Sequence, residues 1–171
     1  MTYAQAMQHL SSLTARPPHG YSDKELDAFV KLVVSEGEVS HYGLLERIKG
    51  ARGLVMLYDG KKLVGTAAIK NPEPDYRTVV FAKSKSNADA AAYPVELGYV
   101  VVAESHRRHK LGWRLVDAAL SFASGSAVFA TTRSNNAAMR RILPARGFTA
   151  NGSPYPSTEH PGQEIHLFLR G

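Results

Sequence analysis

The segment 100–113 combines residue types that suit the binding of an anionic ligand. It begins with three valines of an apolar strand, Val100, Val101 and Val102, and continues through a basic loop into a helix. The loop residues that could contact the ligand are Arg107, Arg108, His109, Lys110, Leu111, Gly112 and Trp113. Backbone N–H groups at the start of a helix lack a partner within the helix and carry partial positive charge, which favours a pyrophosphate. Gly112 would let the backbone approach that ligand closely.

The basic residues of the chain are concentrated around this loop. Between 106 and 146 there are eight Lys and Arg residues and one acidic residue, Asp117, so this segment carries a charge of +7. The whole chain carries +6, which leaves −1 for the remainder. A charge focused in this way indicates an anionic ligand. A solvated basic face is the alternative that the charges alone leave open.

The elements that must position this segment follow from periodicity and turn residues. Met7, Leu10 and Leu13 have helical spacing, and Ser22 with Glu25 forms a capping box that starts the next helix. The expected order is a helix near 7–13, a helix from 22, a short helix at 42–49, a hairpin with strands at 54–58 and 63–69, a strand or loop at 77–82, a flexible stretch at 84–92, a strand at 95–103, a helix at 112–124, a strand at 127–131, a helix at 136–146, and strands at 148–150 and 165–169.

This order predicts an α/β (α+β) fold, in which a mixed central sheet has helices on both faces. A chain of 171 residues is one ordinary domain, so we expect a single domain over 1–171, with the ligand-binding half at about 94–150. The chain has no cysteine, which excludes a disulfide framework and fits a cytoplasmic location. No apolar run approaches the ~18 residues that would span a membrane.

Two motifs together resemble the GNAT superfamily of N-acetyltransferases. The loop from Arg107 to Gly112 matches the family's Gln/Arg-x-x-Gly-x-Gly/Ala loop, five residues after the strand end at Val102. Asn136 opens a helix, with Gly147 and Phe148 eleven residues on, as is usual in the family. One departure is Lys110, which stands where the first loop glycine usually lies. If that position needs a positive φ, a lysine there costs on the order of 1 kcal/mol.

The resemblance implies a fold and a cosubstrate. In this family the fourth and fifth strands splay apart, and the pantetheine of acetyl-CoA lies between them. Backbone groups of Val100, Val101 and Val102 would pair with it, and a backbone N–H at about Val102 would polarise the thioester carbonyl. The loop 107–113 would hold the pyrophosphate, and Asn136 would lie beside the pantetheine arm. An amine would then attack the thioester directly in a ternary complex.

The residues that would transfer protons are one candidate base and two candidate proton donors. Glu96 begins the fourth strand, where many members of the family place a carboxylate base, and strand alternation would put it on the side of Gly98, Val100 and Val102. The tyrosine that often protonates the leaving thiolate is replaced by Leu143. Ser134 and Tyr155 are the other candidate proton donors, and a helix cap is the alternative role for Ser134.

Several functions remain open at this point. An N-acetyltransferase acting on a small or amino-acid-like amine is favoured, because no basic ring marks the acceptor mouth. The alternatives are an acetyltransferase for a macromolecular amine (a protein or charged tRNA) and a CoA-binding module without catalysis. Nucleic-acid binding is disfavoured, because CoA phosphates explain the basic focus. We expect no metal site, since His106 and His109 lack a third ligand nearby in the sequence. A homodimer is an open alternative.

Overall fold

The computed structural model describes residues 2, 11–35 and 39–171. Over these residues the chain forms a seven-stranded mixed sheet in the order β1-β2-β3-β4-β5-β7-β6. The strands are β1 (Ser11–Arg16), β2 (Gly53–Asp59), β3 (Lys62–Lys70), β4 (Val95–Val102), β5 (Val128–Arg133), β6 (Thr149–Pro156) and β7 (Glu164–Arg170). The helices are α2 (Asp23–Ser35), α3 (Leu44–Lys49), α4 (Pro74–Lys83), α5 (Leu111–Leu120) and α6 (Ala137–Ala145). All pairs are antiparallel except β4 with β5.

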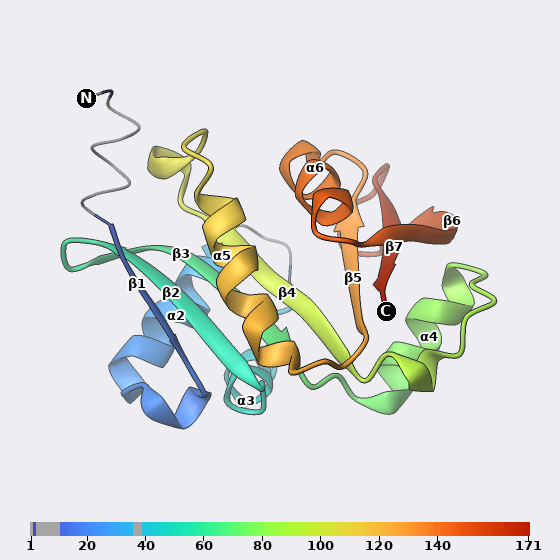
Figure 1. Ribbon diagram of the computed structural model, residues 1–171, viewed down its shortest axis with the longest axis horizontal. Coiled ribbons are helices and arrows are strands. Elements are labelled where there is room, and N and C mark those ends of the chain that lie inside the picture. Colours follow the sequence, from blue (N-terminus) through green and yellow to red (C-terminus); the bar gives the residue numbers. More distant parts are fainter. Residues whose placement is uncertain (1, 3–10, 36–38) are drawn as a thin grey trace.

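Helices cover both faces of the sheet, as predicted (Figure 1). One core packs α5 and α6 against residues such as Val55, Leu57 and Ile69. The opposite face is covered by α2 and α3, whose Phe29 and Ile48 are fully buried. On that second face α4 covers β5 and β7. The α/β fold with a mixed sheet is therefore confirmed.

Two local predictions were wrong. Leu13 lies in strand β1, whereas Met7 and Leu10 of the expected first helix fall outside the described residues. The segment 77–82, expected as a strand or loop, belongs to helix α4. Its β-branched residues favour a strand, but Pro74 at the first helical turn starts a helix. Burial of Phe81 against Phe129 then holds that helix on the sheet.

The capping box is confirmed at the start of α2. The Ser22 backbone N–H donates to Glu25 Oε2 at 2.8 Å, and the Glu25 N–H donates to Ser22 Oγ at 3.2 Å. The β2–β3 hairpin, the helix after the basic loop and the Gly147 helix end are also found, with boundaries that differ by a few residues. The stretch 84–92, expected to be flexible, includes a short 3₁₀ helix, Ala90–Ala92.

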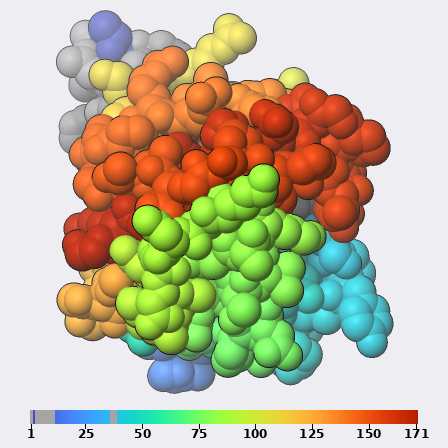
Figure 2. Space-filling view, turned by 90° about the vertical axis from the view of Figure 1, so that its right-hand side faces the viewer, coloured from blue at the N-terminus to red at the C-terminus, as the bar shows by residue number. Residues whose placement is uncertain are grey.

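The segment that follows α4 is hydrogen-bonded to strand β6. The Ser153 N–H donates to the Ser84 carbonyl at 2.7 Å, and Ser86 Oγ donates to Asn151 Oδ1 at 2.5 Å. Gly152 has a φ of +68°, and a Cβ atom there would lie 2.1 Å from the Ser84 carbonyl oxygen. Figure 2 shows this close packing of the green segment after α4 beneath the orange-red hairpin of β6 and β7. We call these contacts between 84–86 and 151–153 the Ser84 clasp.

Strands β4 and β5 pair over only two residues each. Val95 is opposite Val128 and Glu96 is opposite Phe129, and the ladder then ends. Beyond this point the two strands diverge, with α5 in front of β4 and α6 in front of β5 (Figure 1). The sheet therefore has an open notch between two neighbouring strands, as the family resemblance implies.

Candidate active site

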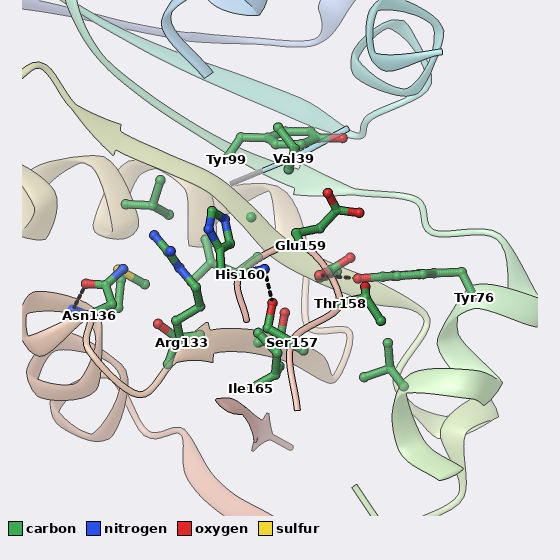
Figure 3. Close-up of a pocket in the computed structure, with 18 of the residues that line it drawn as sticks. Val39, Tyr76, Tyr99, Arg133, Asn136, Ser157, Thr158, Glu159, His160 and Ile165 are labelled. Carbon is green, nitrogen blue, oxygen red and sulfur yellow. Dashed lines mark hydrogen bonds between the residues drawn. The ribbon is translucent and has the colours of Figure 1, made fainter. Parts of the chain in front are cut away.

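The notch between β4 and β5 opens into a cavity of about 330 Å³ (Figure 3). Its walls come from four parts of the chain: β4, the end of β5 with the start of α6, helix α4, and the hairpin of β6 and β7. Residues on these walls include Glu96, Gly98, Tyr99, Val100, Val101, Thr131, Thr132, Arg133, Asn136, Tyr76, Val79, Lys83, Tyr155, Ser157, Thr158, Glu159 and His160. The volume is at the small end of the range for small-molecule sites.

Glu96 is the buried carboxylate of this cavity, with only 3% of its surface exposed. Its Oε2 forms an ion pair with Lys70 Nζ at 2.8 Å. Its Oε1 accepts a hydrogen bond from the Tyr76 hydroxyl at 3.3 Å, which is a long bond. A water or a substrate amine could therefore replace Tyr76 at Oε1 more easily than Lys70 could be displaced from Oε2.

Lys70 reaches Glu96 by lying along the surface of β4. Its Nζ is 4.7 Å from the centre of the Tyr99 ring and 5.6 Å from that of Tyr76, so two aromatic faces contact the ammonium. A Cβ atom at Gly98 would lie 2.6 Å from Lys70 Cδ, which explains why a glycine suits this strand position. Burial is the largest effect and would lower the pKa of Lys70, but the charge of Glu96, the Tyr99 hydroxyl and the hydrogen bond to Glu96 together raise the pKa. Lys70 therefore stays a cation.

Two tyrosines close the cavity around Glu96. The charge of Glu96, followed by burial, raises the pKa of Tyr76 far above its ordinary value, so its hydroxyl remains a donor. Burial, followed by the charge of Glu96, raises the pKa of Tyr155 to about 12. Lys83 Nζ lies 6.0 Å from the centre of the Tyr155 ring. Tyr155 is thus a protonated phenol on the cavity wall at neutral pH.

A bulge in β4 overturns one detail of the sequence analysis. Tyr99 has a φ of +53°, and between Val101 and Gly98 the β3–β4 register shifts by one residue. Before the bulge, Leu97 packs in the core under α5, and after it Val100 and Val102 pack against that same core. Tyr99 and Val101 pack on the opposite side. Glu96 therefore does not share a face with Val100 and Val102, because the bulge interrupts the alternation.

The bulge also directs main-chain groups of β4 into the notch. Thr66 Oγ1 donates to the Tyr99 carbonyl at 2.8 Å from the β3 side. In a trans peptide the next N–H points the opposite way, so the Val100 N–H points away from β3. Farther along, the Ala103 N–H donates to the Val64 carbonyl, and ladder alternation turns the main chain of Val102 away from β3 as well.

The basic loop leads from β4 into α5, beyond the described lining of the cavity. Lys110 precedes α5 with a φ of +58°, and Arg108 has a φ of +67°, so the position of the family's missing glycine does need a positive φ. Arg107 Nε donates to the Val102 carbonyl at 3.1 Å. Trp113 packs on the α5 core, and the Arg146 guanidinium lies 4.8 Å from the centre of its ring.

The structure separates the predicted site residues into two groups. Glu96, Val100, Val101, Asn136 and Tyr155 line the cavity together. The second group lies outside its described lining: Val102, Arg107, Arg108, His109, Lys110, Leu111, Gly112, Trp113 and Ser134.

Asn136, and not Ser134, caps the helix that follows β5. Asn136 Oδ1 accepts the Met139 N–H at 3.1 Å. The Ser134 hydroxyl instead donates to Gln163 Oε1 at 3.2 Å, on the chain that leads into β7. The alternative role of Ser134 as a cap was therefore wrong, and its hydroxyl is bonded away from the cavity.

Sequence reasoning did not select Lys70, Tyr76, Glu159 or His160 as residues of the site. Lys70 is opposite Glu96 only through the β3–β4 register, which no local pattern reveals. Tyr76 was hidden by the wrong assignment of α4. Glu159 and His160 lie in the turn between β6 and β7 and line the cavity.

Comparison with known proteins agrees with this geometry. The sequence model of the Acetyltransferase (GNAT) family matches residues 11–148, most of the chain. The chain belongs to the GNAT acetyltransferase family. The predictions of the family and of an acyltransferase are thereby confirmed.

Solved structures share the GNAT fold at low sequence identity. An acyl-CoA N-acyltransferase from Pseudomonas aeruginosa has a TM-score of 0.67 at 18% identity, over 94% of this chain and 99% of that one. Arabidopsis thaliana Naa50, in complex with the bisubstrate analogue CoA-Ac-MVNAL, has 0.67 at 14%, over 95% and 99%. The ribosomal-protein-S18-alanine N-acetyltransferase from Escherichia coli has 0.64 at 15%, over 94% and 92%. No curated protein sequence matches significantly.

In residues 2, 11–35 and 39–171 no three His, Asp or Glu side chains form a group that could hold a metal ion. In the same part of the chain no helix is long and apolar enough to cross a bilayer.

Proposed function

We propose that this single GNAT domain transfers an acetyl group from acetyl-CoA to the primary amine of a small, amino-acid-like acceptor. The observation that carries the proposal is the notch between β4 and β5, where main-chain groups of Val100 form one wall and the buried Glu96 lies at the other end. Acetyl-CoA supplies a thioester, and the protein supplies its orientation, a hydrogen-bond donor and proton transfer.

The residues of the notch fit the donor in two ways. Val100 and Val102 turn their main-chain groups away from β3, so a pantetheine amide could pair with them as an added strand would. The loop 107–113 presents basic side chains and the first N–H groups of α5 to the pyrophosphate. Asn136 lies across the notch from Val100, where it would contact the pantetheine arm.

The other end of the cavity fits a small acceptor. Tyr76 and Val79 from α4, and Tyr155 and Glu159 from the hairpin, surround the space beside Glu96. A peptide or tRNA end would need an entrance past α4 and the loop 157–160. Naa50 and the S18-alanine acetyltransferase are named for protein acceptors, so peptides belong in the test of this proposal.

In the proposed step the acceptor nitrogen bonds to the carbonyl carbon as the carbon–sulfur bond breaks. Glu96 takes the proton that the nitrogen loses, through Oε1 and a water that replaces the Tyr76 hydroxyl. The Val100 N–H donates to the carbonyl oxygen, in place of the Val102 N–H that sequence reasoning selected, because Val100 lines the cavity. Tyr155 gives its proton to the sulfur and regains one from solvent.

The test measures binding and turnover separately. Acetyl-CoA is expected to raise the melting temperature and to change Trp113 fluorescence, because the cosubstrate binds the folded state beside α5. Released thiol is then followed against small amines, amino acids, peptides and a lysine-rich protein. An unchanged melting temperature at millimolar acetyl-CoA would exclude the CoA site. Binding with no turnover for any amine would favour a CoA-binding module, and turnover with peptides alone would favour a macromolecular acceptor.

Tyr155→Phe is expected to reduce kcat about tenfold with little change in KM for acetyl-CoA. The effect is modest because a thiol with a pKa near 8.5 is already a good leaving group. Since the pKa of Tyr155 is about 12, the wild-type phenol stays protonated from neutral to mildly alkaline pH and should produce no descending limb there. The pH profile of kcat for both proteins checks this, with Tyr93→Phe as a control outside the cavity. An unchanged kcat would remove Tyr155 from the mechanism.

A further inference from the structure

Thr66 places a hydroxyl at a buried position of β3, where an apolar side chain would be expected. Thr66 is fully buried, with 0% of its surface exposed, and it lies opposite Val101 in the register. Its hydroxyl donates a hydrogen bond to the Tyr99 carbonyl at 2.8 Å. Thr66 thus contacts the one residue of β4 that has a positive φ, and it does so through the main chain of that residue.

This bond fixes the orientation of a single peptide unit. The Tyr99 carbonyl and the Val100 N–H belong to the same planar trans peptide and therefore point in opposite directions. Because Thr66 holds the carbonyl on the β3 side, the N–H points toward the notch. A tyrosine at a φ of +53° is strained, so the peptide needs an external constraint to stay in this orientation.

We propose that Thr66 is a positioning residue that holds the Val100 N–H toward the carbonyl oxygen of the bound thioester. The inference rests on the proposed function for its substrate. Thr66 does not touch the cavity. It acts through the Tyr99–Val100 peptide. Without the Thr66 hydroxyl, that peptide can rotate so that the Val100 N–H no longer points at the thioester oxygen. A donor that must be realigned in each turnover stabilises the transition state less than a fixed donor does.

The experiment compares Thr66→Val, which keeps the shape and removes the hydroxyl, with Thr66→Ser, which keeps the hydroxyl. For Thr66→Val we expect kcat to fall about tenfold to a hundredfold, as partial loss of one oxyanion donor, with KM for acetyl-CoA nearly unchanged. Thr66→Ser should recover most of the wild-type kcat. Equal kcat for the wild type and Thr66→Val, or an equal loss in both variants, would overturn the proposal.

A spectroscopic measurement makes the inference independent of the acceptor. Acetyl-CoA carrying ¹³C at the thioester carbonyl is bound to each protein, and its C=O stretch is recorded by infrared difference. We expect a shift to lower frequency in the wild type and in Thr66→Ser, and a smaller shift in Thr66→Val, because a fixed N–H donor weakens the C=O bond. If the wild type shifts nothing, or if all three proteins shift equally, the positioning role is wrong.

These outcomes separate the two proposals. If no amine is acetylated but the three infrared spectra differ as expected, the proposed acceptor chemistry fails while the role of Thr66 stands. If amines are acetylated and Thr66→Val behaves like the wild type, the inference about Thr66 fails alone. Should Thr66→Val not fold, Thr66→Ala compared with Thr66→Ser gives the same contrast between two small side chains.

Discussion

Glu96→Gln is expected to lower kcat by about 10²- to 10⁴-fold at neutral pH, the range that general bases contribute. The amide keeps the size and the hydrogen bond from Tyr76, but it cannot accept the proton of the acceptor amine. The loss should shrink as the pH rises, because a larger fraction of the free amine is then already neutral. The measurement is kcat from about pH 6 to about pH 10, followed by released thiol.

The control for this variant is Glu164→Gln, which changes an exposed carboxylate outside the lining of the cavity. It should keep kcat within a few-fold. Glu96→Gln also leaves the Lys70 ammonium without its counter-charge, which costs about 3 kcal/mol when a buried pair loses one member. Melting temperature and acetyl-CoA affinity must therefore be measured on the same sample. Retained binding with unchanged kcat would remove Glu96 from proton transfer.

Gly152→Ala is expected to lower the free energy of unfolding by about 2–4 kcal/mol. Part of this is the 1–2 kcal/mol that an L side chain pays at positive φ, here +68°. The rest arises because the new Cβ would collide with the Ser84 carbonyl oxygen, and the Ser153 bond to that carbonyl must break. Urea unfolding followed by circular dichroism measures the change.

Gly60→Ala is the matched control for this second prediction. Gly60 also has a positive φ, +58°, but nothing lies within 4 Å of the Cβ position. It should lose only the conformational part, about 1–2 kcal/mol. Equal losses in the two variants would show that the clasp around Ser84 contributes nothing to stability.

Regular local signals allowed much of this fold to be predicted. The turn of Asp59 and Gly60 located the β2–β3 hairpin, and the amphipathic run after Gly112 located α5. Both depend on neighbours within a few residues. Helix α4 was not predicted because its local residues favour a strand. The contact that stabilises the helix is between Phe81 and Phe129, which are 48 positions apart in the sequence.

The sequence predicted some residues of the candidate site but not their arrangement. Glu96 was selected from the family pattern and Tyr155 as a substitute for the family tyrosine that Leu143 replaces, and both line the cavity. The ion pair of Glu96 with Lys70 depends on strand register, and the side on which Glu96 lies depends on the bulge at Tyr99. A bulge of one residue moves every later side chain of a strand to the opposite face of the sheet. The residue types of β4 do not indicate a bulge, because tyrosine rarely adopts a positive φ.

The Ser84 clasp has a consequence for self-association. Strand β6 is the last strand of the sheet, where unpaired backbone groups would normally invite strand addition from another molecule. Near Gly152 those groups are already engaged by the chain itself, through the Ser84 carbonyl. A second copy joining here would first have to displace an internal hydrogen bond of 2.7 Å. Strand addition from another molecule is therefore disfavoured along this stretch of β6.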